Sequence, residues 1–233
     1  DIFSALYFHI LNNDPKNPEW PERDRLILSN GHICPIRYAS MALAGYFDIS
    51  ELQTLRKFGS RLQGHPEKVK LPGLETTSGP LGLGLGQAAG IAYGAKMDGK
   101  NFKVFCVMSD GEQEEGNTWE SAMFAGKNNL GNLIAIIDQN NIQISGKVND
   151  VMPIEPLTEK YKAFGWNVLE CDGNNIAEFL AVADSAKSSA SNHPTVIIAQ
   201  TVAGKGIKEI EGDYLWHGRV PTSQEAERFL REL

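Results

Sequence analysis

The chain has 233 residues, of which 42% are hydrophobic and 22% charged, a balance typical of a soluble globular protein. It carries 29 acidic and 22 basic residues, so its net charge of −7 argues against a nucleic-acid-binding or anionic-membrane-binding protein. No apolar run approaches the roughly 20 residues that a membrane-spanning helix needs. These totals predict one large globular domain, with neither nucleic acid nor a membrane as its partner.

The cysteines and the N-terminus favour a cytoplasmic setting. Cys34, Cys106 and Cys171 are isolated and odd in number, which predicts reduced thiols instead of disulfides or a zinc site. The chain starts at Asp1 and continues with an apolar, helix-like pattern that lacks the basic segment of a signal peptide. A start without methionine inside such a pattern predicts that residues upstream are missing.

The predicted elements alternate along the chain. Helical patterns cover 2–11, 37–46, 49–57 and 84–97, and the later ones cover 118–128, 176–188 and 223–230. The strands are predicted at 103–108, 132–138, 166–170 and 195–201. These strands are nearly continuously apolar, as expected when helices cover both faces of a sheet. The pattern predicts a single α/β domain over 1–233 with a mostly parallel central sheet.

Polar loops follow two of the predicted strands. Three long irregular stretches are expected at 58–80, 140–155 and 203–221, and loops of this length are uncommon unless they have a function. "SDGEQEEG" (109–116) follows one strand end and "DQNNIQISG" (138–146) follows the next. Ligands of open α/β sheets bind beyond the carboxyl ends of the strands. We therefore expect these two loops to converge on one ligand.

The loop chemistry is suited to a cation and a diphosphate. A carboxylate from Asp110, a carboxamide oxygen from Asn140 and a nearby backbone carbonyl are hard ligands that suit Mg²⁺, which usually completes its shell with water and phosphate. Gly111 would let a diphosphate approach the backbone. The cation is needed because Asp110 and a diphosphate otherwise repel each other. Taken alone, two such dipeptides at this spacing also arise by chance.

Four motifs together resemble one known family. "SDGEQEEGNTWESAMFAGKNNLGNLIAIIDQNNIQISG" resembles the GDG…NN signature of thiamine-diphosphate enzymes in its transketolase form, with Ser109 in place of the first glycine. "DRLILSNGHICP", "GHPE" and "LETTSGPLGLGLGQAAGIAYGAK" also resemble transketolase, in the family's order. The resemblance covers 1–233 and corresponds only to the family's N-terminal, diphosphate-binding domain. It implies the thiamine-diphosphate-binding fold.

The resemblance also implies the cofactor ligands. Asp110, the side chain of Asn140 and the carbonyl of Ile142 would ligate Mg²⁺, for which Ca²⁺ or Mn²⁺ could substitute. Gly111 would lie against the diphosphate of thiamine diphosphate. The backbone at Gly79 would meet the aminopyrimidine, although simple turn chemistry also explains a glycine there. Two residues further on, Leu81 would pack on the pyrimidine ring.

The resemblance separates the three glutamates of the acidic loop. Glu115 matches the glutamate that faces the other subunit and hydrogen-bonds the carboxylate that activates the pyrimidine. Neighbouring carboxylates raise one another's pKa, so such a pair is a plausible proton relay. Glu112 and Glu114 are instead predicted to be solvated charges near the N-terminus of the next helix, where its dipole favours them.

Three of the five histidines adjoin a glycine and are predicted in irregular segments, where imidazole can donate to phosphate or move protons. The resemblance implies that His32 and His217 contact the cofactor diphosphate or the reacting centre. It implies that His65 hydrogen-bonds the sugar substrate. A lone histidine is more often structural, and we predict that role for His9 and His193.

"GLGLGQAAG" does not fit a dinucleotide fingerprint, because no strand directly precedes it and no acidic residue follows at the expected distance. Its helix instead carries Gly86, Gly90 and Gly94 as a small-residue stripe. One hypothesis places this stripe at a subunit interface. The alternative buries it against the domain's own sheet.

The resemblance implies that this chain is one half of an enzyme. A complete transketolase has two further domains, and the second supplies the glutamate that activates the cofactor. We therefore expect the N-terminal subunit of a split transketolase, which transfers a two-carbon ketol unit between sugar phosphates. It would be inert without a C-terminal partner subunit that carries the pyrimidine-binding domain, with two of each chain in a heterotetramer. A piece of a longer enzyme is the other explanation.

Competing functions remain. A deoxyxylulose-phosphate synthase and one half of a keto-acid dehydrogenase share the cofactor, but "SNGH", "GHPE" and "TTSGPLG" favour transketolase. A non-catalytic subunit that only binds cofactor or assembles a complex is a different class, which the retained Asp110, Glu115 and Asn140 argue against. A protein that only binds Mg²⁺ and a nucleotide would be expected to show a P-loop or a Rossmann fingerprint, and the sequence has neither.

Overall fold

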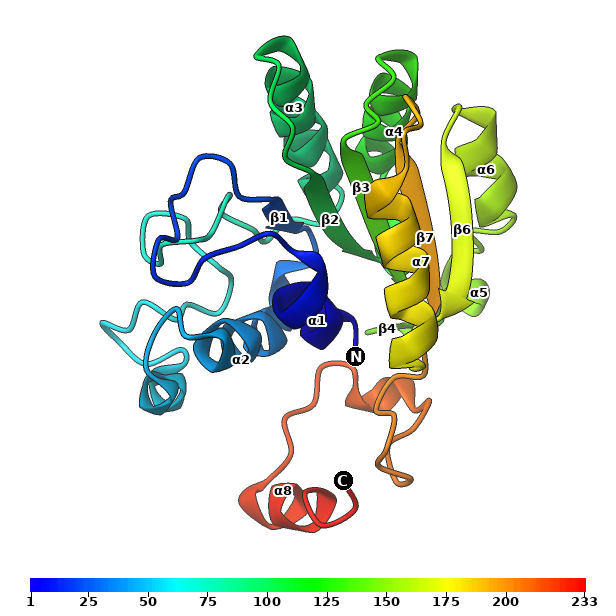
Figure 1. The fold of residues 1–233 in the computed structure, drawn as a ribbon. Helices are drawn as coiled ribbons and strands as arrows, with labels where there is room; N and C mark the ends of the chain where they lie inside the picture. The colour runs from blue at the N-terminus through cyan, green and yellow to red at the C-terminus, as the bar shows by residue number, and fades with distance from the viewer.

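Five parallel strands form the central sheet of the computed structural model, which describes residues 1–233 (Figure 1). In spatial order they are β1 (Arg25–Leu28), β2 (Val104–Ser109), β3 (Leu133–Gln139), β7 (Thr195–Gln200) and β6 (Asn167–Asp172). Every pairing in this sheet is parallel, which confirms the predicted α/β class. None of the helices combines the length and the apolar character needed to cross a membrane.

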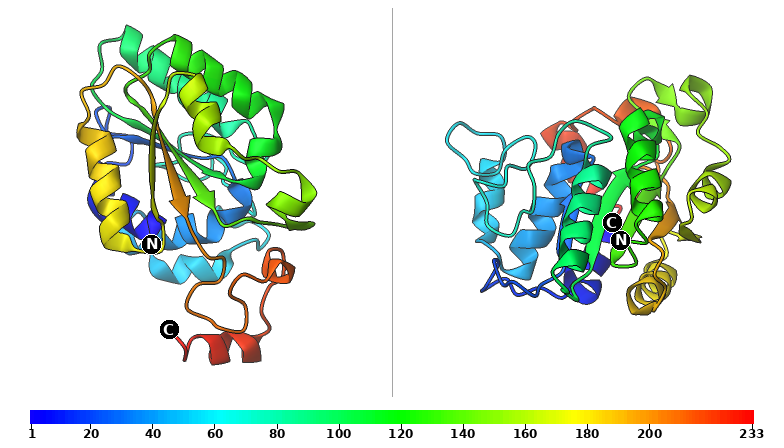
Figure 2. Two further views of the ribbon diagram at one scale, coloured as in Figure 1. Left: turned by 90° about the vertical axis from the view of Figure 1, so that its right-hand side faces the viewer. Right: turned by 90° about the horizontal axis from the view of Figure 1, so that it is seen from above.

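Helices cover both faces of the sheet (Figures 1 and 2). One face carries α1 (Ile2–Ala5), α2 (Cys34–Ala44) and α7 (Ile176–Ser188), and the other carries α3 (Gly84–Met97), α4 (Gly116–Lys127) and α6 (Leu157–Ala163). Successive strand residues point to opposite faces, so β2 contributes to two separate cores. Phe105 and Val107 pack in the first core, and Cys106 and Met108 in the second. This explains the continuous apolar run of the strand.

Most predicted helices are present with shifted ends. The N-terminal helix continues from α1 through a π-helical turn, Leu6–Ile10. Helix α2 begins three residues earlier than predicted, with Pro35 in its first turn, and ends where Gly45 adopts a left-handed φ of 96°. The predicted helix 49–57 is instead a 3-10 helix, Ile49–Thr54, capped by Asp48. The last helix, α8 (Ser223–Phe229), starts with a capping box at Thr222.

The sequence patterns missed several short elements. Strand β1 and helix α6 were not predicted, and neither were the two-stranded hairpin of β4 (Ile142–Gln143) and β5 (Gly146–Lys147) or the short helix α5 (Val148–Val151). The prediction of an irregular 140–155 was therefore wrong in part. Residues 58–80 contain no helix or strand, and 203–221 contain only the 3-10 helix Tyr214–Trp216. The missed elements are too short to show a periodic pattern.

The glycine stripe of α3 is largely free of contacts. A Cβ added to Gly86 would lie 3.0 Å from the Ser121 hydroxyl of α4, so this glycine allows the two helices to pack closely. A Cβ added to Gly90 or Gly94 would meet nothing within 4 Å. The alternative that buries the whole stripe against the domain's own sheet was therefore wrong, whereas the subunit-interface hypothesis stays a prediction.

Candidate active site

Polar segments after β1, β2 and β3 meet at the carboxyl edge of the sheet. In the parallel register Leu28 pairs with Val107 and Ser109 pairs with Asp138, so the three strand ends lie side by side. They border a cavity of about 420 Å³, here called the strand-end cavity. Seven of the predicted site residues line it: His32, Leu81, Gly111, Glu115, Asn140, Ile142 and His217. The two polar loops border one cavity, and the ligand expected there stays a prediction.

The remaining three predicted residues lie beside this cavity. Asp110 borders an adjoining cleft of about 350 Å³, whose lining also includes Asn140. A Cβ added to Gly79 would lie 3.8 Å from Cγ of His65, so these two residues are neighbours. His65 is also close enough to His32 to lower the pKa of that imidazole.

Asp110 is buried at the end of β2, where its residue is only 1% exposed. One carboxylate oxygen accepts a hydrogen bond from the Gly111 amide at 2.7 Å, and the other accepts from the Asn141 amide. Burial raises the pKa of Asp110 to about 6, an effect that these backbone hydrogen bonds oppose and nearby Asp138 reinforces. Asn141 adopts φ 59°, a conformation that asparagine tolerates better than most residues.

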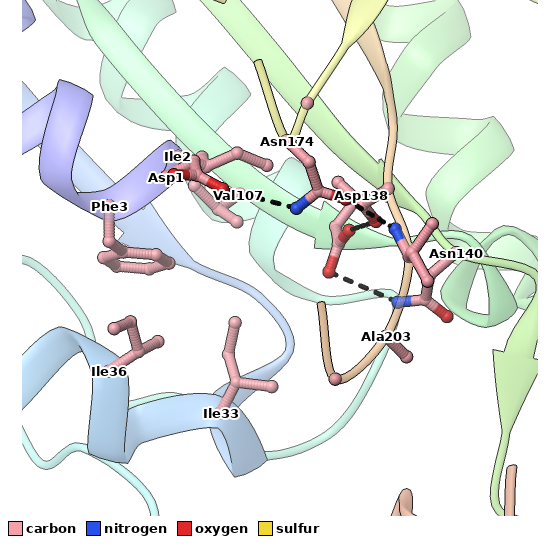
Figure 3. Close-up of a pocket in the computed structure, with 14 residues that line it drawn as sticks. Asp1, Ile2, Phe3, Ile33, Ile36, Val107, Asp138, Asn140, Asn174 and Ala203 are labelled. Carbon is pink, nitrogen blue, oxygen red and sulfur yellow. Dashed lines mark hydrogen bonds between the residues drawn. The ribbon is translucent and has the colours of Figure 1, made fainter. Parts of the chain in front are cut away.

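Asn140 and Asp138 point toward each other in the lining of another, smaller cavity of about 240 Å³ (Figure 3). The Asn140 amide donates to Asp138 at 3.3 Å, and the Thr201 hydroxyl donates to the other oxygen of Asp138. The carboxamide oxygen of Asn140 accepts from the Ile142 amide at 2.9 Å. These contacts fix the orientation of the Asn140 side chain. Burial also raises the pKa of Asp138.

The predicted residues fit a cation shared with a ligand. Asp110 is buried and Asp138 is half-buried, and none of the ion pairs of the chain involves either of them. A cation would relieve the cost of their burial. The chain has no group of three or more His, Cys, Asp and Glu side chains that could hold a metal. A metal here would therefore need amide, carbonyl and phosphate oxygens as well.

Two histidines face each other over the cavity. The 3-10 helix Gly31–Ile33 carries His32, and His217 directly follows the 3-10 helix Tyr214–Trp216. Their ring centroids are 5.6 Å apart. Partial desolvation by the surrounding loops lowers the pKa of both imidazoles, although the His217 residue is still exposed. For His32 the neighbouring His217 and His65 lower the pKa further. Both rings are therefore neutral at pH 7, where each can donate one hydrogen bond and accept another.

Glu115 packs against the tight turn at Gly82, directly after Leu81. Gly82 adopts φ 77°, and an added Cβ there would lie 2.6 Å from Cβ of Glu115. The turn therefore requires glycine for its conformation and for its close approach to Glu115. Leu81 keeps 37% of its surface exposed, and Glu115 is exposed as well. Both side chains are thus open to a ligand or to another chain.

The prediction for Glu112 was wrong. This residue is fully buried and accepts hydrogen bonds from the Ser29 hydroxyl, from the Gly82 amide at 2.6 Å and from the Ser109 amide at 3.3 Å. Burial raises the pKa of Glu112, and these hydrogen bonds oppose the rise. Glu114 is exposed, as predicted.

Several residues of the strand-end cavity were missed from the sequence. Asn30 belongs to the "SNGH" motif and Asp138 lies two residues before the "NN" motif, so their sequence positions offered a signal. Gln143 lies in the second polar loop, but nothing in the sequence placed it against Gly111: its side-chain oxygen lies 2.9 Å from where a Cβ on Gly111 would stand. Trp216 is held by the Phe229 ring of α8, at 5.5 Å between centroids. These last contacts join segments that are distant in the chain.

The chain is an α/β protein with a cavity at the carboxyl ends of its parallel strands, where open α/β sheets bind their ligands. The family model described as "Transketolase, thiamine diphosphate binding domain" matches residues 1–232, and the chain therefore belongs to the transketolase family. This confirms the resemblance found in the sequence.

Known relatives include separate subunits. The chain is 41% identical over its whole length to a 6-deoxy-6-sulfo-D-fructose transketolase subunit from Clostridium sp. (strain MSTE9), of which it covers 84%. It is 42% identical to an apulose-4-phosphate transketolase subunit from Actinobacillus succinogenes, with the same coverage. These relatives confirm the match to an N-terminal transketolase subunit and do not favour the synthase or dehydrogenase alternatives.

Longer transketolases match only in part. The chain is 39% identical to human transketolase-like protein 2 but covers 37% of its length. Among solved structures, transketolase from Campylobacter jejuni superimposes with a TM-score of 0.84 at 36% identity, over 91% of this chain and 34% of that one. A Pichia stipitis transketolase complex with sedoheptulose 7-phosphate gives a TM-score of 0.86 at 32% identity, over 98% of this chain and 34% of that one.

Proposed function

We propose that this chain is the diphosphate-binding subunit of a two-chain transketolase that transfers a two-carbon ketol unit from a ketose phosphate to an aldose phosphate. The observation that carries the proposal is the convergence of seven predicted site residues on the strand-end cavity in a chain of the transketolase family. Because two relatives are named for 6-deoxy-6-sulfo-D-fructose and apulose 4-phosphate, these two sugars should be included among the donors that are tested.

Asp110, Asn140 and the carbonyl of Ile142 would hold Mg²⁺ and, through it, the diphosphate of thiamine diphosphate. Asp110 supplies the negative charge, and Asp138 orients Asn140 through the 3.3 Å hydrogen bond. Thiamine diphosphate supplies a stabilised carbanion for the transfer of the ketol unit. Gly111 lies where the backbone of the first loop borders the cavity, which suits contact with the diphosphate.

The histidines and Glu115 would act around the reacting groups. Neutral His32 and His217 can each donate to a phosphate or substrate oxygen and accept a proton from a hydroxyl. His65, beside Gly79, would hydrogen-bond the sugar, while Gly79 and Leu81 would contact the pyrimidine. Glu115 is exposed, so it can reach a carboxylate of a second chain.

The partner would be a C-terminal subunit that carries the pyrimidine-binding domain, assembled as two copies of each chain in the cytoplasm. The decisive experiment measures ketol transfer with thiamine diphosphate and Mg²⁺ for this chain alone and mixed with such a subunit. We expect activity only in the mixture. Activity of the rigorously purified single chain would refute the two-chain proposal, and a mixture that forms a complex without activity would support a non-catalytic role.

A further inference from the structure

We propose that Glu112 is a positioning residue, whose buried carboxylate aligns three of the chain segments that border the strand-end cavity. The proposal rests on the proposed cofactor function. It concerns a residue that is not among the proposed ligand contacts and does not line the cavity. Its evidence is a set of hydrogen bonds that converge on one side chain.

The carboxylate joins segments that are far apart in the chain. One oxygen accepts from the Ser29 hydroxyl, which follows β1, and from the Gly82 amide, which precedes α3. The other oxygen accepts from the Ser109 amide at the end of β2. Ser29 extends the network, because its hydroxyl accepts from the Gly84 amide at 3.0 Å. All four donors lie in or directly beside the loops that surround the cavity.

Each of these segments carries a proposed ligand contact. Ser29 is three residues before His32, Gly82 directly follows Leu81, and Ser109 directly precedes Asp110. The segments are also packed too closely to shift independently. A Cβ on Gly84 would lie 2.3 Å from Cβ of Ser29, and Gly82 approaches Glu115 almost as closely. A shift of one segment would therefore move the others.

No positively charged side chain offsets the free-energy cost of burying the Glu112 carboxylate. Glu112 forms no ion pair with a lysine or arginine. It is instead satisfied by hydrogen bonds and by its place at the N-terminus of α3, where the helix dipole favours a negative charge. A buried charge held this way is a poor source of stability compared with apolar packing. Its value lies in fixing the geometry of the loops, as groups behind a ligand site commonly do.

The test compares three variants of the whole chain. Glu112→Ala removes all the acceptors, while Glu112→Gln keeps an oxygen for Ser29 and Gly82 and loses only the longest contact, to Ser109. Asp24→Ala is the control: Asp24 is also a buried carboxylate, bonded to the Asn12 and Lys103 amides at 2.8 Å each, but it pairs with Lys187 at 2.8 Å and lies before β1 at the opposite edge of the sheet. Binding of thiamine diphosphate with Mg²⁺ is measured by calorimetry, and folding by thermal denaturation.

We expect Glu112→Ala to weaken cofactor binding by about 10- to 100-fold, and Glu112→Gln to bind within about threefold of the unmodified chain. Asp24→Ala should lower the melting temperature without weakening binding. Should Glu112→Ala fail to fold, Ser29→Ala removes one donor to the carboxylate and should give a smaller loss of affinity in a folded chain.

Three results would overturn the proposal. These are normal binding by a folded Glu112→Ala chain, an equal loss of affinity in Asp24→Ala, and a Glu112→Gln chain as weak as the alanine variant. The last would show that the charge, and not hydrogen-bond acceptance, is required. Failure of the unmodified chain to bind thiamine diphosphate would instead refute the proposed function itself.

Discussion

Replacing Asp110 by asparagine should abolish Mg²⁺-dependent cofactor binding yet leave the free chain about as stable as before. Burial raises the pKa of this carboxyl from 3.8 to about 6. At about 1.4 kcal/mol per pKa unit, the folded chain holds the ionised group at a cost of about 3 kcal/mol. Because the folded pKa is the higher one, this cost is absent below about pH 4, grows as the pH rises to 6 and is complete at pH 7.

Asparagine removes that cost and introduces another. Its amide group would face one of the two backbone donors, Gly111 or Asn141, and an unsatisfied buried group costs about 1–3 kcal/mol. The two effects nearly cancel. Since 1 kcal/mol shifts the melting temperature by about 2–4 °C in a domain of this size, a change of only a few degrees is expected.

Cofactor binding should respond much more strongly. Two unit charges 4 Å apart near a protein surface attract each other by about 4 kcal/mol, and Mg²⁺ carries two charges. We therefore expect affinity for thiamine diphosphate to fall at least about 100-fold, or roughly 2.8 kcal/mol.

Calorimetric titration in saturating Mg²⁺ gives the affinity, and thermal denaturation without Mg²⁺ gives the stability. Asp98→Asn, an exposed acid before β2, is the control. Unchanged affinity in the Asp110→Asn chain would refute the ligand assignment. A fall in melting temperature of more than about 10 °C would show that the hydrogen bonds of Asp110, and not a cation, explain its burial.

Three further predictions concern the proposed relay, the histidine pair and the glycine stripe. Glu115→Gln should fold normally but slow turnover of the reconstituted pair by about 10- to 100-fold, and unchanged turnover would remove its relay role. His217→Ala should lower ketol transfer with little effect on melting temperature, because the residue is exposed; a fully active variant would exclude a role at the reacting centre. Gly90→Leu should stabilise α3 by up to about 1 kcal/mol but disrupt assembly, and an unchanged sedimentation mass would contradict the interface hypothesis.

The sequence by itself determined four of the five strands of the sheet and the place of the site. Strand β2 is apolar on both faces because its alternate residues enter two cores, so its hydrophobic run was visible without the structure. Asp110 directly follows β2, and Asn140 directly follows β3. Parallel neighbouring strands end at the same edge, so local sequence was sufficient to bring these two residues together.

Only the tertiary structure showed that Glu112 of that loop is buried. Glu112 and Glu114 are two residues apart in one acidic run, yet the first is fully buried and the second exposed. The difference arises from donors 83 and 30 residues away, Ser29 and Gly82. Likewise, His32 meets His217 because the last loop folds back over the strand ends. Burial of a charge depends on partners that the fold supplies, so local sequence patterns could not reveal it.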